Sequence, residues 1–260
     1  MLEWAGPRRY HGARMRLAIL SDIHGNLAAL KAVAADLAAR GVDEVVNLGD
    51  SLSGPLLPLE TAHFLMAQGW THLAGNHERQ LLTLEPAARG PSDAYAHSQL
   101  THAELAWLET LHPTARLGPE ILLCHGTPGS DVEPFLDTVE PGGTVRPASR
   151  AEVAWRLGGE RATLVACGHT HLPHCVRGPQ GELLVNPGSV GLPAYEDQHP
   201  WPHVVETGSP DARYAVVERR AGVWSCALLA VPYDVRPMAA LAAQRGRPEW
   251  ERALRTGYLR

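Results

Sequence analysis

The first half of the chain alternates short apolar runs with segments of helical period, a pattern typical of an α/β sheet. Residues 27–40 place apolar side chains on one helical face, and Gly41 follows where glycine commonly ends a helix. Capping-box patterns that begin at Thr101 and Ser149 predict two further helices, and another is expected near 59–68. The apolar runs predict buried strands at 17–20, 45–48, 71–74, 121–124 and 163–167.

The second half of the chain changes to strand-like periods. Residues 214–218 and 223–230 predict a hairpin that turns around Gly222. The preceding segment, 186–211, is rich in proline and glycine and predicts a long loop. Loops of this length inside compact domains are usually functional, so this segment is a candidate wall of a binding site.

We expect one domain over residues 15–260, which ends in a helix at about 236–256. Residues 1–14 precede the first patterned strand and are predicted to be a disordered N-terminal extension. They lack the apolar segment that a secretory signal peptide carries.

Composition narrows the classes of function. The 260 residues include 23 Lys and Arg against 28 Asp and Glu, and the resulting charge of −5 argues against binding of nucleic-acid polymers. No apolar run approaches the roughly 20 residues of a membrane-spanning helix, so no membrane contact is expected. The four cysteines form no CxxC motif, which indicates reduced thiols and a cytoplasmic location. The single lysine, Lys31, excludes a Walker-type phosphate loop, and the 14 histidines need an explanation.

Five of the predicted strands end in the same way, with a metal-ligand type of side chain beside a glycine. In chain order these side chains are Asp22 and His24, Asp50, Asn76 with His77 and Glu78, His125, and His169 with His171. In open α/β sheets the carboxyl ends of the strands form the binding crevice, and glycine lets the backbone turn sharply there. We therefore expect these side chains to converge.

The types of these residues indicate which metal ions they would bind. Two aspartates, one asparagine and four histidines suit divalent Mn²⁺, Fe²⁺, Ni²⁺ or Zn²⁺, with Mn²⁺ favoured. Seven side chains are too many for one ion, and they fit two ions that share a bridging carboxylate. No cysteine joins the set, so a structural zinc site fits poorly.

The ordered set Asp22-x-His24, Gly49-Asp50, Gly75-Asn76-His77-Glu78, His125 and Gly168-His169-x-His171 resembles the calcineurin-like metallophosphoesterase superfamily. Within it, the chain is most similar to the compact bacterial and archaeal YfcE-like phosphoesterases. The resemblance covers about residues 15–230, with all five motifs in order. It implies an α/β fold, a four-layer αββα sandwich of two mixed β-sheets flanked by helices. It also implies a dinuclear metal site at the C-terminal ends of the strands.

The resemblance further implies a role for each motif residue. Asp22, His24 and His171 would bind the first metal, Asn76, His125 and His169 the second, and Asp50 would bridge the two. His77 would contact the phosphate and protonate the leaving oxygen, a role that suits an imidazole near neutrality. Asn76 and Arg79 would also contact the substrate.

Several residues near the motifs have a structural as well as a functional interpretation. Glu78 would either orient His77 or simply favour the N-terminus of a helix. Arg79 would reach a substrate phosphate or remain a solvated helix residue. The turn at 186–189 and the segment 195–203 would shape the substrate mouth, or would be a strand-ending turn and a proline-stiffened surface loop.

Departures from the pattern discriminate among subfamilies. Eukaryotic-type Ser/Thr protein phosphatases carry arginines where this chain has Ala74 and the residues after Ser51. Without those guanidiniums a bidentate clamp on a phosphomonoester is less evident, which favours a small phosphoesterase that acts on diesters.

We therefore expect a metal-dependent phosphoric ester hydrolase that acts on the phosphodiester, or phosphomonoester, bonds of a small substrate. A water or hydroxide that bridges two metals would attack phosphorus, with His77 as the general acid. The alternatives are a phosphoprotein phosphatase of the same superfamily and a catalytically silent scaffold on this fold.

Overall fold

The computed structural model describes residues 14–260, whose strands form two five-stranded mixed sheets and two separate hairpin pairs. The first sheet contains β1 (Arg14–Leu20), β2 (Glu44–Asn47), β3 (Thr71–His72), β13 (Ala212–Arg220) and β14 (Val223–Val231), in the order β14-β13-β1-β2-β3. The second contains β4 (Thr114–Leu117), β5 (Ile121–Cys124), β8 (Leu164–Ala166), β9 (His174–Arg177) and β10 (Leu183–Asn186), in the order β4-β5-β8-β10-β9. The pairs are β6 (Asp137–Val139) with β7 (Val145–Pro147), and β11 (Ala194–Asp197) with β12 (His203–Glu206).

Helices connect and cover these strands. They are α1 (Leu27–Arg40), α2 (Pro58–Met66), α3 (Asn76–Thr83), α4 (Pro91–Gln99), α5 (His102–Glu109), α6 (Arg150–Leu157), α7 (Arg236–Gln244) and α8 (Pro248–Thr256), with a 3₁₀ turn at Pro86–Ala88. The predicted helix ends are confirmed. Gly41 ends α1 in the left-handed conformation, and capping boxes at Thr101 and Ser149 begin α5 and α6.

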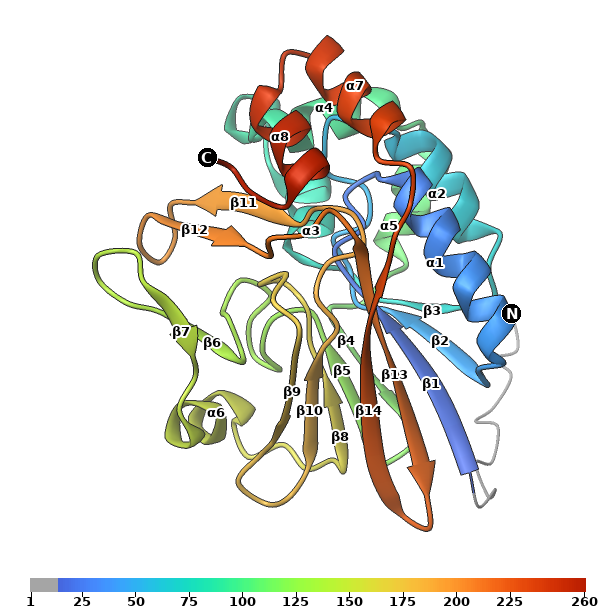
Figure 1. The fold of residues 1–260 in the computed structure, drawn as a ribbon, viewed down its shortest axis with the longest axis vertical. Helices are drawn as coiled ribbons and strands as arrows, with labels where there is room; N and C mark the ends of the chain where they lie inside the picture. The colour runs from blue at the N-terminus through green and yellow to red at the C-terminus, as the bar shows by residue number, and fades with distance from the viewer. Residues whose placement is uncertain (1–13) are drawn as a thin grey trace.

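Three apolar layers hold the sheets and helices together. Leu17, Ile19 and Val46 of the first sheet pack between the sheets against apolar residues of the second. On the outer face of the first sheet, Ala18 and Leu20 pack against α1, α2 and α5. On the outer face of the second sheet, residues of β5, β8 and β10 pack against α6. This order of helix, sheet, sheet and helix is the αββα sandwich that the resemblance implies (Figure 1).

The five strands that end in ligand-type residues run in parallel within their sheets. β1 pairs in parallel with β2, and β2 with β3, while β5 pairs in parallel with β8. Their carboxyl ends approach one another where the two sheets meet below α3 (Figure 1). The fold therefore brings five loops together, as the alternating pattern predicts.

Some predicted elements differ from the structure. The hairpin is confirmed, with Arg220 paired to Val223. The strand expected at 71–74 stops at His72, after which Leu73 forms only an isolated bridge to His112. The segment 186–211 is not a single loop, because the hairpin β11–β12 lies inside it.

The two ends of the predicted domain also differ in detail. The helix expected at about 236–256 is two helices, because the chain turns at Gly246, which has a φ of 69°, and Pro248 begins α8. At the other end, β1 begins at Arg14, and the predicted disordered extension otherwise lies outside the described residues. Within residues 14–260 no helix has the length and apolar character needed to cross a membrane.

Candidate metal centre and its cavity

The loops that follow the parallel strands are joined by backbone hydrogen bonds. The amide of Asp22 donates to the carbonyl of Gly49 at 3.0 Å, and the amide of His24 donates to that of Asp50 at 3.0 Å. In the second sheet, the amide of Gly168 donates to the carbonyl of His125 at 2.7 Å. The loops therefore form a continuous floor rather than independent flexible segments.

The candidate ligands are held in an unusual backbone conformation. Positive φ angles occur at Asp22 (57°), His24 (51°), Asp50 (54°), His169 (70°) and His171 (59°). Among the described residues other than glycine, Ala221 alone shares this conformation. A left-handed backbone at a residue with a side chain costs about 1–3 kcal/mol and persists only where the surroundings enforce it. Such strain concentrated at five ligand-type residues marks this floor as a functional site.

Two groups of side chains have ligand atoms that converge. Asp22, His24 and His171 form one group, and Asp50, His125 and His169 form the other. Within each group the candidate atoms all lie within 4.8 Å of one another. The sequence predicts these six residues as ligands, and the fold brings them together, with Asp50, the predicted bridge, beside His125 and His169.

Backbone carbonyls orient three of the histidines. The Nδ1 atoms of His24, His125 and His171 lie 2.8, 2.9 and 2.7 Å from the carbonyl oxygens of Ser53, Leu48 and Leu192, respectively. Each Nδ1 therefore carries the proton and donates it, so Nε2 can present a lone pair. Metal-ligating histidines commonly use their second nitrogen in this way.

The first group fits a metal ion better than it fits a hydrogen-bonded cluster. His24 Nε2 and His171 Nε2 face each other at 3.2 Å, although neither has a proton to donate in this tautomer. Asp22 Oδ1 lies 3.4 Å from His171 Nε2 and, fully buried, finds no hydrogen-bond partner among residues 14–260. Such an orphaned oxygen beside two lone pairs is the donor set that a divalent cation satisfies.

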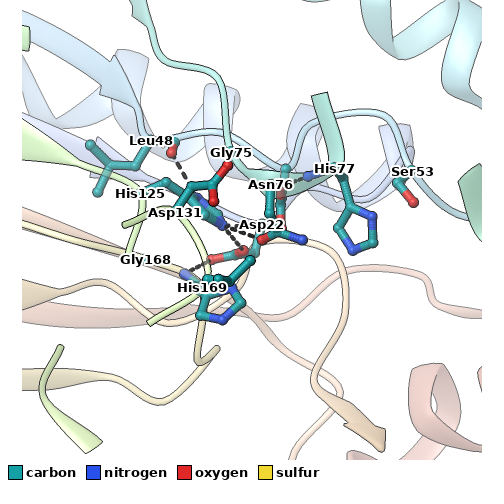
Figure 2. Close-up of polar contacts among 12 residues, drawn as sticks. Asp22, Leu48, Ser53, Gly75, Asn76, His77, His125, Asp131, Gly168 and His169 are labelled. Carbon is teal, nitrogen blue, oxygen red and sulfur yellow. Dashed lines mark hydrogen bonds and ion pairs between the residues drawn. The ribbon is translucent and has the colours of Figure 1, made fainter. Parts of the chain in front are cut away.

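The second group has an additional oxygen donor. Asp50 Oδ2 lies 3.1 Å and Asn76 Oδ1 lies 3.2 Å from His125 Nε2. Figure 2 shows Asn76 and Asp22 directed toward His125 at this floor, with His169 next to them. Asp50 Oδ1 in turn accepts the backbone N–H of His77 at 2.9 Å, which fixes the carboxylate against α3.

Burial and charge set the protonation of these groups. Burial, reinforced by the neighbouring His171, lowers the pKa of His24 to about 4, and burial beside His125 lowers the pKa of His169 to about 4. Burial alone would raise the pKa of Asp50, but His125 and His77 hold it well below its usual range. At neutral pH His24 and His169 are therefore neutral and Asp50 is ionised, the forms that bind metal.

Glycine is required beside the carboxylates. A Cβ atom on Gly75 would lie 2.2 Å from Asp50 Oδ1, and one on Gly168 would lie 3.0 Å from Asp22 Oδ2 and 2.0 Å from Ser21 Oγ. Larger residues would displace the ligands. The glycines of the motifs therefore leave room for the carboxylates.

His77 stands beside the two groups and has its own carboxylate partner. Its Nδ1 lies 2.8 Å from Oδ1 of Asp93, a buried residue of α4. Burial lowers the pKa of His77, but Asp50 and Asp93 outweigh it and raise the pKa to about 9. In Figure 2 the His77 ring lies apart from the rings of His125 and His169. His77 therefore keeps a proton that it can deliver from Nε2.

Glu78 acts on the backbone rather than on His77. Its carboxylate accepts the amides of Asp50 at 2.7 Å, Ser51 at 2.8 Å and Gly75 at 2.7 Å. Glu78 therefore caps the N-terminus of α3 and links the loop of Asp50 to the loop of Asn76. Asp93, which the sequence analysis missed, occupies the orienting position instead.

The model of the calcineurin-like phosphoesterase superfamily domain matches residues 15–207. The chain belongs to this family. The two ligand groups and the αββα architecture agree with a metal-dependent phosphoesterase fold, as the sequence motifs predict.

Several proteins resemble this chain over most of its length. The structure of a metallophosphoesterase from Sphaerobacter thermophilus is 25% identical, with a TM-score of 0.73 over 94% of this chain and 100% of the other. A hypothetical protein from Pyrococcus horikoshii OT3 shares the fold, with a TM-score of 0.67 and 18% identity over 94% of this chain and 99% of the other. An uncharacterized protein of Methanocaldococcus jannaschii is 23% identical over 90% of this chain and 94% of its own length. Yfce from E. coli is also similar, at 22% identity and a TM-score of 0.42, a more distant likeness than the two structures above.

Arg79 and the turn at 186–189 lie near the motifs but do not face the cavity. Arg79 forms two hydrogen bonds with Asp131, at 2.6 and 3.0 Å, and does not line the cavity described below. Asn186 donates to the carbonyl of Gly168 at 2.8 Å, and Ser189 Oγ donates to the carbonyl of Asp22 at 2.7 Å. The turn at 186–189 therefore supports the ligand loops from behind.

A cavity of about 1050 Å³ opens above the ligand groups. His24, Asp50, Asn76, His77, His169 and His171 line its floor. Its walls come from the α3–α4 segment, from β6, from β11 and the residues after it, and from the start of α8. The segment 195–203 contributes Tyr195, His199 and Pro200, whereas His203 turns back to the carbonyl of Trp201.

The start of α8 and Leu259 form part of the cavity wall, beyond the region that the family model matches. α8 contacts β11, and α7 and α8 both lie above β11 and β12 in Figure 1. Trp250 of α8 is 7% exposed and packs edge-on against the ring of His24, with ring centroids 6.1 Å apart. α8 thereby contacts the candidate metal ligand His24 through Trp250.

Proposed function

We propose that this protein hydrolyses phosphodiester bonds, or phosphomonoester bonds, of a small substrate with the help of two divalent metal ions. The observation that carries the proposal is the convergence of two ligand groups beside His77 on the floor of one cavity. The family membership and the similarity to a metallophosphoesterase from Sphaerobacter thermophilus support it.

We assign each ligand group to one metal. Asp22, His24 and His171 would hold the first ion, Asn76, His125 and His169 the second, and Asp50 would bridge them. Asp50 suits the bridge because one oxygen faces His125 while the carboxylate is fixed against α3 through the amide of His77. Mn²⁺ is our preferred metal, since the set contains only nitrogen and oxygen donors.

Bound divalent ions would lower the pKa of a coordinated water and neutralise charge on the phosphoryl oxygens. His77 would donate its Nε2 proton to the leaving oxygen, while the carboxylate of Asp93 accepts from Nδ1 and stabilises the charged form. Asn76 would add an oxygen donor without adding negative charge. The cavity walls would exclude bulk water from the leaving group.

The arginines of the cavity support a preference for diesters over monoesters. Arg156 and Arg247 are the arginines that line it among the described residues. Arg156 donates to two backbone carbonyls, and Arg247 pairs with Glu249 at 2.5 Å. Neither guanidinium is free to clamp a doubly charged phosphate, so a singly charged diester suits the site better.

The size of the cavity and its C-terminal wall support a small substrate rather than a phosphoprotein or a nucleic-acid polymer. A volume of about 1050 Å³ is close to the upper range of cavities that take small molecules.

The cysteines of the chain are all unpaired thiols, which supports a cytoplasmic location.

Hydrolysis of bis-p-nitrophenyl phosphate by the Mn²⁺-loaded protein tests the proposal. We expect turnover that requires added metal and that falls at least ten-fold in His77→Ala, since general acid catalysis contributes about 10²–10⁴-fold. An activated p-nitrophenol leaving group needs less protonation, so a diester with an alkyl leaving group should show a larger loss.

The exposed histidine of α5, His102, provides the matched control, and His102→Ala should retain wild-type turnover. Metal-loaded protein that binds two equivalents of Mn²⁺ yet hydrolyses neither diesters nor monoesters would favour the silent scaffold. Turnover of phosphopeptides alone would favour the phosphoprotein phosphatase.

A further inference from the structure

A buried carboxylate outside the ligand groups has both of its oxygens in hydrogen bonds. Asp137 of β6 is 1% exposed. Its Oδ2 accepts the hydroxyl of Thr170 at 2.7 Å, and its Oδ1 accepts Nε2 of His174 at 2.7 Å. Neither Asp137 nor His174 belongs to a motif of the sequence, and neither lines the cavity. A buried carboxylate is costly unless hydrogen bonds satisfy it, and these two bonds do so.

Thr170 is the residue between two candidate metal ligands. His169 and His171, on either side of it, have φ angles of 70° and 59°. The side chain of Thr170 points away from the cavity floor, toward Asp137. Its position therefore decides where the backbone of both histidines lies.

The hydrogen bonds around Thr170 have a single consistent direction. Asn186 Nδ2 donates to Thr170 Oγ1 at 3.1 Å, so the hydroxyl must donate its own proton onward to Asp137. Asn186 Nδ2 also donates to the carbonyl of Gly168 at 2.8 Å. The Thr170 hydroxyl is thus held on one side by the amide of Asn186 and on the other by the carboxylate of Asp137.

We propose that Asp137 is a positioning residue of the metal centre, because its bond to Thr170 fixes the loop that carries His169 and His171. The inference rests on the proposed metal-binding role of these histidines. A hydrogen bond to a charged acceptor is shorter and stronger than one to a neutral acceptor. Asp137 therefore holds both strained histidines more firmly than an amide or a water would.

The position of Asp137 also joins the ligand loop to the cavity wall. Thr138 and Val139, its neighbours in β6, line the cavity. Arg156, another lining residue, donates to the carbonyl of Asp137 at 2.8 Å and to Thr138 Oγ1 at 2.9 Å. β6 thus lines the cavity through Thr138 and Val139, and it orients the candidate metal ligands through the adjacent Asp137.

Mn²⁺ binding to full-length Asp137→Asn, measured by calorimetry on metal-free protein, tests this role. The amide keeps the size of the side chain but removes the negative charge that strengthens the hydrogen bond from Thr170. We expect affinity for Mn²⁺ to fall about ten- to a hundred-fold, as for other groups that orient metal ligands. With saturating Mn²⁺, kcat for bis-p-nitrophenyl phosphate should fall while KM stays within about two-fold.

Thr170→Val provides an independent variant that retains shape and removes only the hydroxyl. It should weaken Mn²⁺ binding as Asp137→Asn does, and the double variant should be no weaker than either single one. Glu182→Gln is the matched control, because Glu182 is also a buried carboxylate but lies before β10, at the opposite end of that strand from the ligands.

Wild-type Mn²⁺ affinity in Asp137→Asn would overturn the proposal, and so would additive losses in the double variant. If Asp137→Asn fails to fold, the affinity of Thr170→Val decides alone. Metal affinity is measured without substrate, so an inactive but metal-binding wild-type protein would refute the proposed hydrolase function and leave this test intact.

Discussion

Asp93 Oδ1 and His77 Nδ1 lie 2.8 Å apart, although the two residues belong to different helices. α3 carries His77 beside the ligand groups, and α4 returns across it with the buried carboxylate. The pair defines one tautomer of the imidazole and directs Nε2 into the cavity. A mobile imidazole could not deliver a proton along a fixed line, so the α3–α4 contact is part of the site.

Asp93→Asn should therefore lower kcat for an alkyl phosphodiester about ten- to a hundred-fold. The amide can still accept a hydrogen bond, but it no longer stabilises the protonated ring by charge. KM should change less than kcat, because the metal groups that bind the phosphate are intact. Glu85→Gln, which removes an exposed carboxylate between the same two helices, should behave as wild type. Equal activity of Asp93→Asn and wild type would remove Asp93 from the site.

The pH profile gives a second test of this pair. Asp50 and Asp93 raise the pKa of His77 to about 9 against the opposing effect of burial. A general acid must be protonated, so kcat should fall as the pH rises through this pKa. Bound cations oppose the charge of Asp50, which places the falling limb at or below about pH 9. In Asp93→Asn the limb should move to lower pH, and an unmoved limb would assign it to another group.

Sequence could predict the ligand residues but not this partner. Asp22, Asp50 and His125 lie within three residues of the ends of β1, β2 and β5, and the strand order of an α/β sheet brings such positions together. Asp93 lies 16 residues from His77 in a helix with little apolar pattern, and only the packing of α4 on α3 determines their distance. The same holds for Asp137, which reaches Thr170 from a strand 33 residues earlier.

The errors in the sequence analysis have a related cause. The proline and glycine content of 186–211 correctly indicates turns, but it hides the short hairpin β11–β12 between them. Glu78 fits its interpretation as a residue at the N-terminus of a helix, because it accepts the amide of Gly75 at the start of α3, but its hold on the amide of Asp50 was not predictable. A carboxylate at the start of a helix satisfies whichever donors the neighbouring loop presents, and those depend on tertiary structure.

Binding of metal should release a proton from the second group. Burial alone would lower the pKa of His125, but Asp50 and Asp22 raise it to about 10 in the absence of metal. At pH 7.5 the metal-free ring is therefore protonated, and a cation has to displace that proton. Calorimetric titration with Mn²⁺ in two buffers of different ionisation enthalpy should report about one released proton. Identical enthalpies in both buffers would contradict this expectation.

Removal of metal by a chelator should abolish activity and leave the fold largely intact. The apolar layers on both faces of the sheets do not include the ligand groups, so they persist without metal. The far-ultraviolet circular dichroism should change little, and the melting temperature should fall because metal binds only the folded state. Unfolding on chelation would instead identify the site as structural.

Gly75→Ala should inactivate the protein through displacement of a ligand. The new Cβ would lie 2.2 Å from Asp50 Oδ1 and 2.8 Å from Asp50 N, so the carboxylate has to move. A displacement of about 1 Å at a reacting centre can lower the rate 10²-fold, and we expect a loss of this order in kcat. Gly69→Ala is the control, because no atom lies within 4 Å of its Cβ position. Retained activity in Gly75→Ala would mean that Asp50 does not need its present position.

Trp250→Ala tests whether the C-terminal wall of the cavity supports the site. Trp250 is 7% exposed, and its ring packs against that of His24. It lies so close to Gly54 that a Cβ atom added there would be 2.8 Å from its Cη2 atom. Loss of a buried tryptophan costs about 3–5 kcal/mol in the free energy of unfolding. Trp155→Ala, at a side chain that is 73% exposed, should cost much less. With both variants assayed below their melting temperatures, Trp250→Ala should also weaken Mn²⁺ binding, because His24 loses the ring that backs it. A stability loss with unchanged Mn²⁺ affinity would show that α8 closes the cavity without supporting the metal ligand.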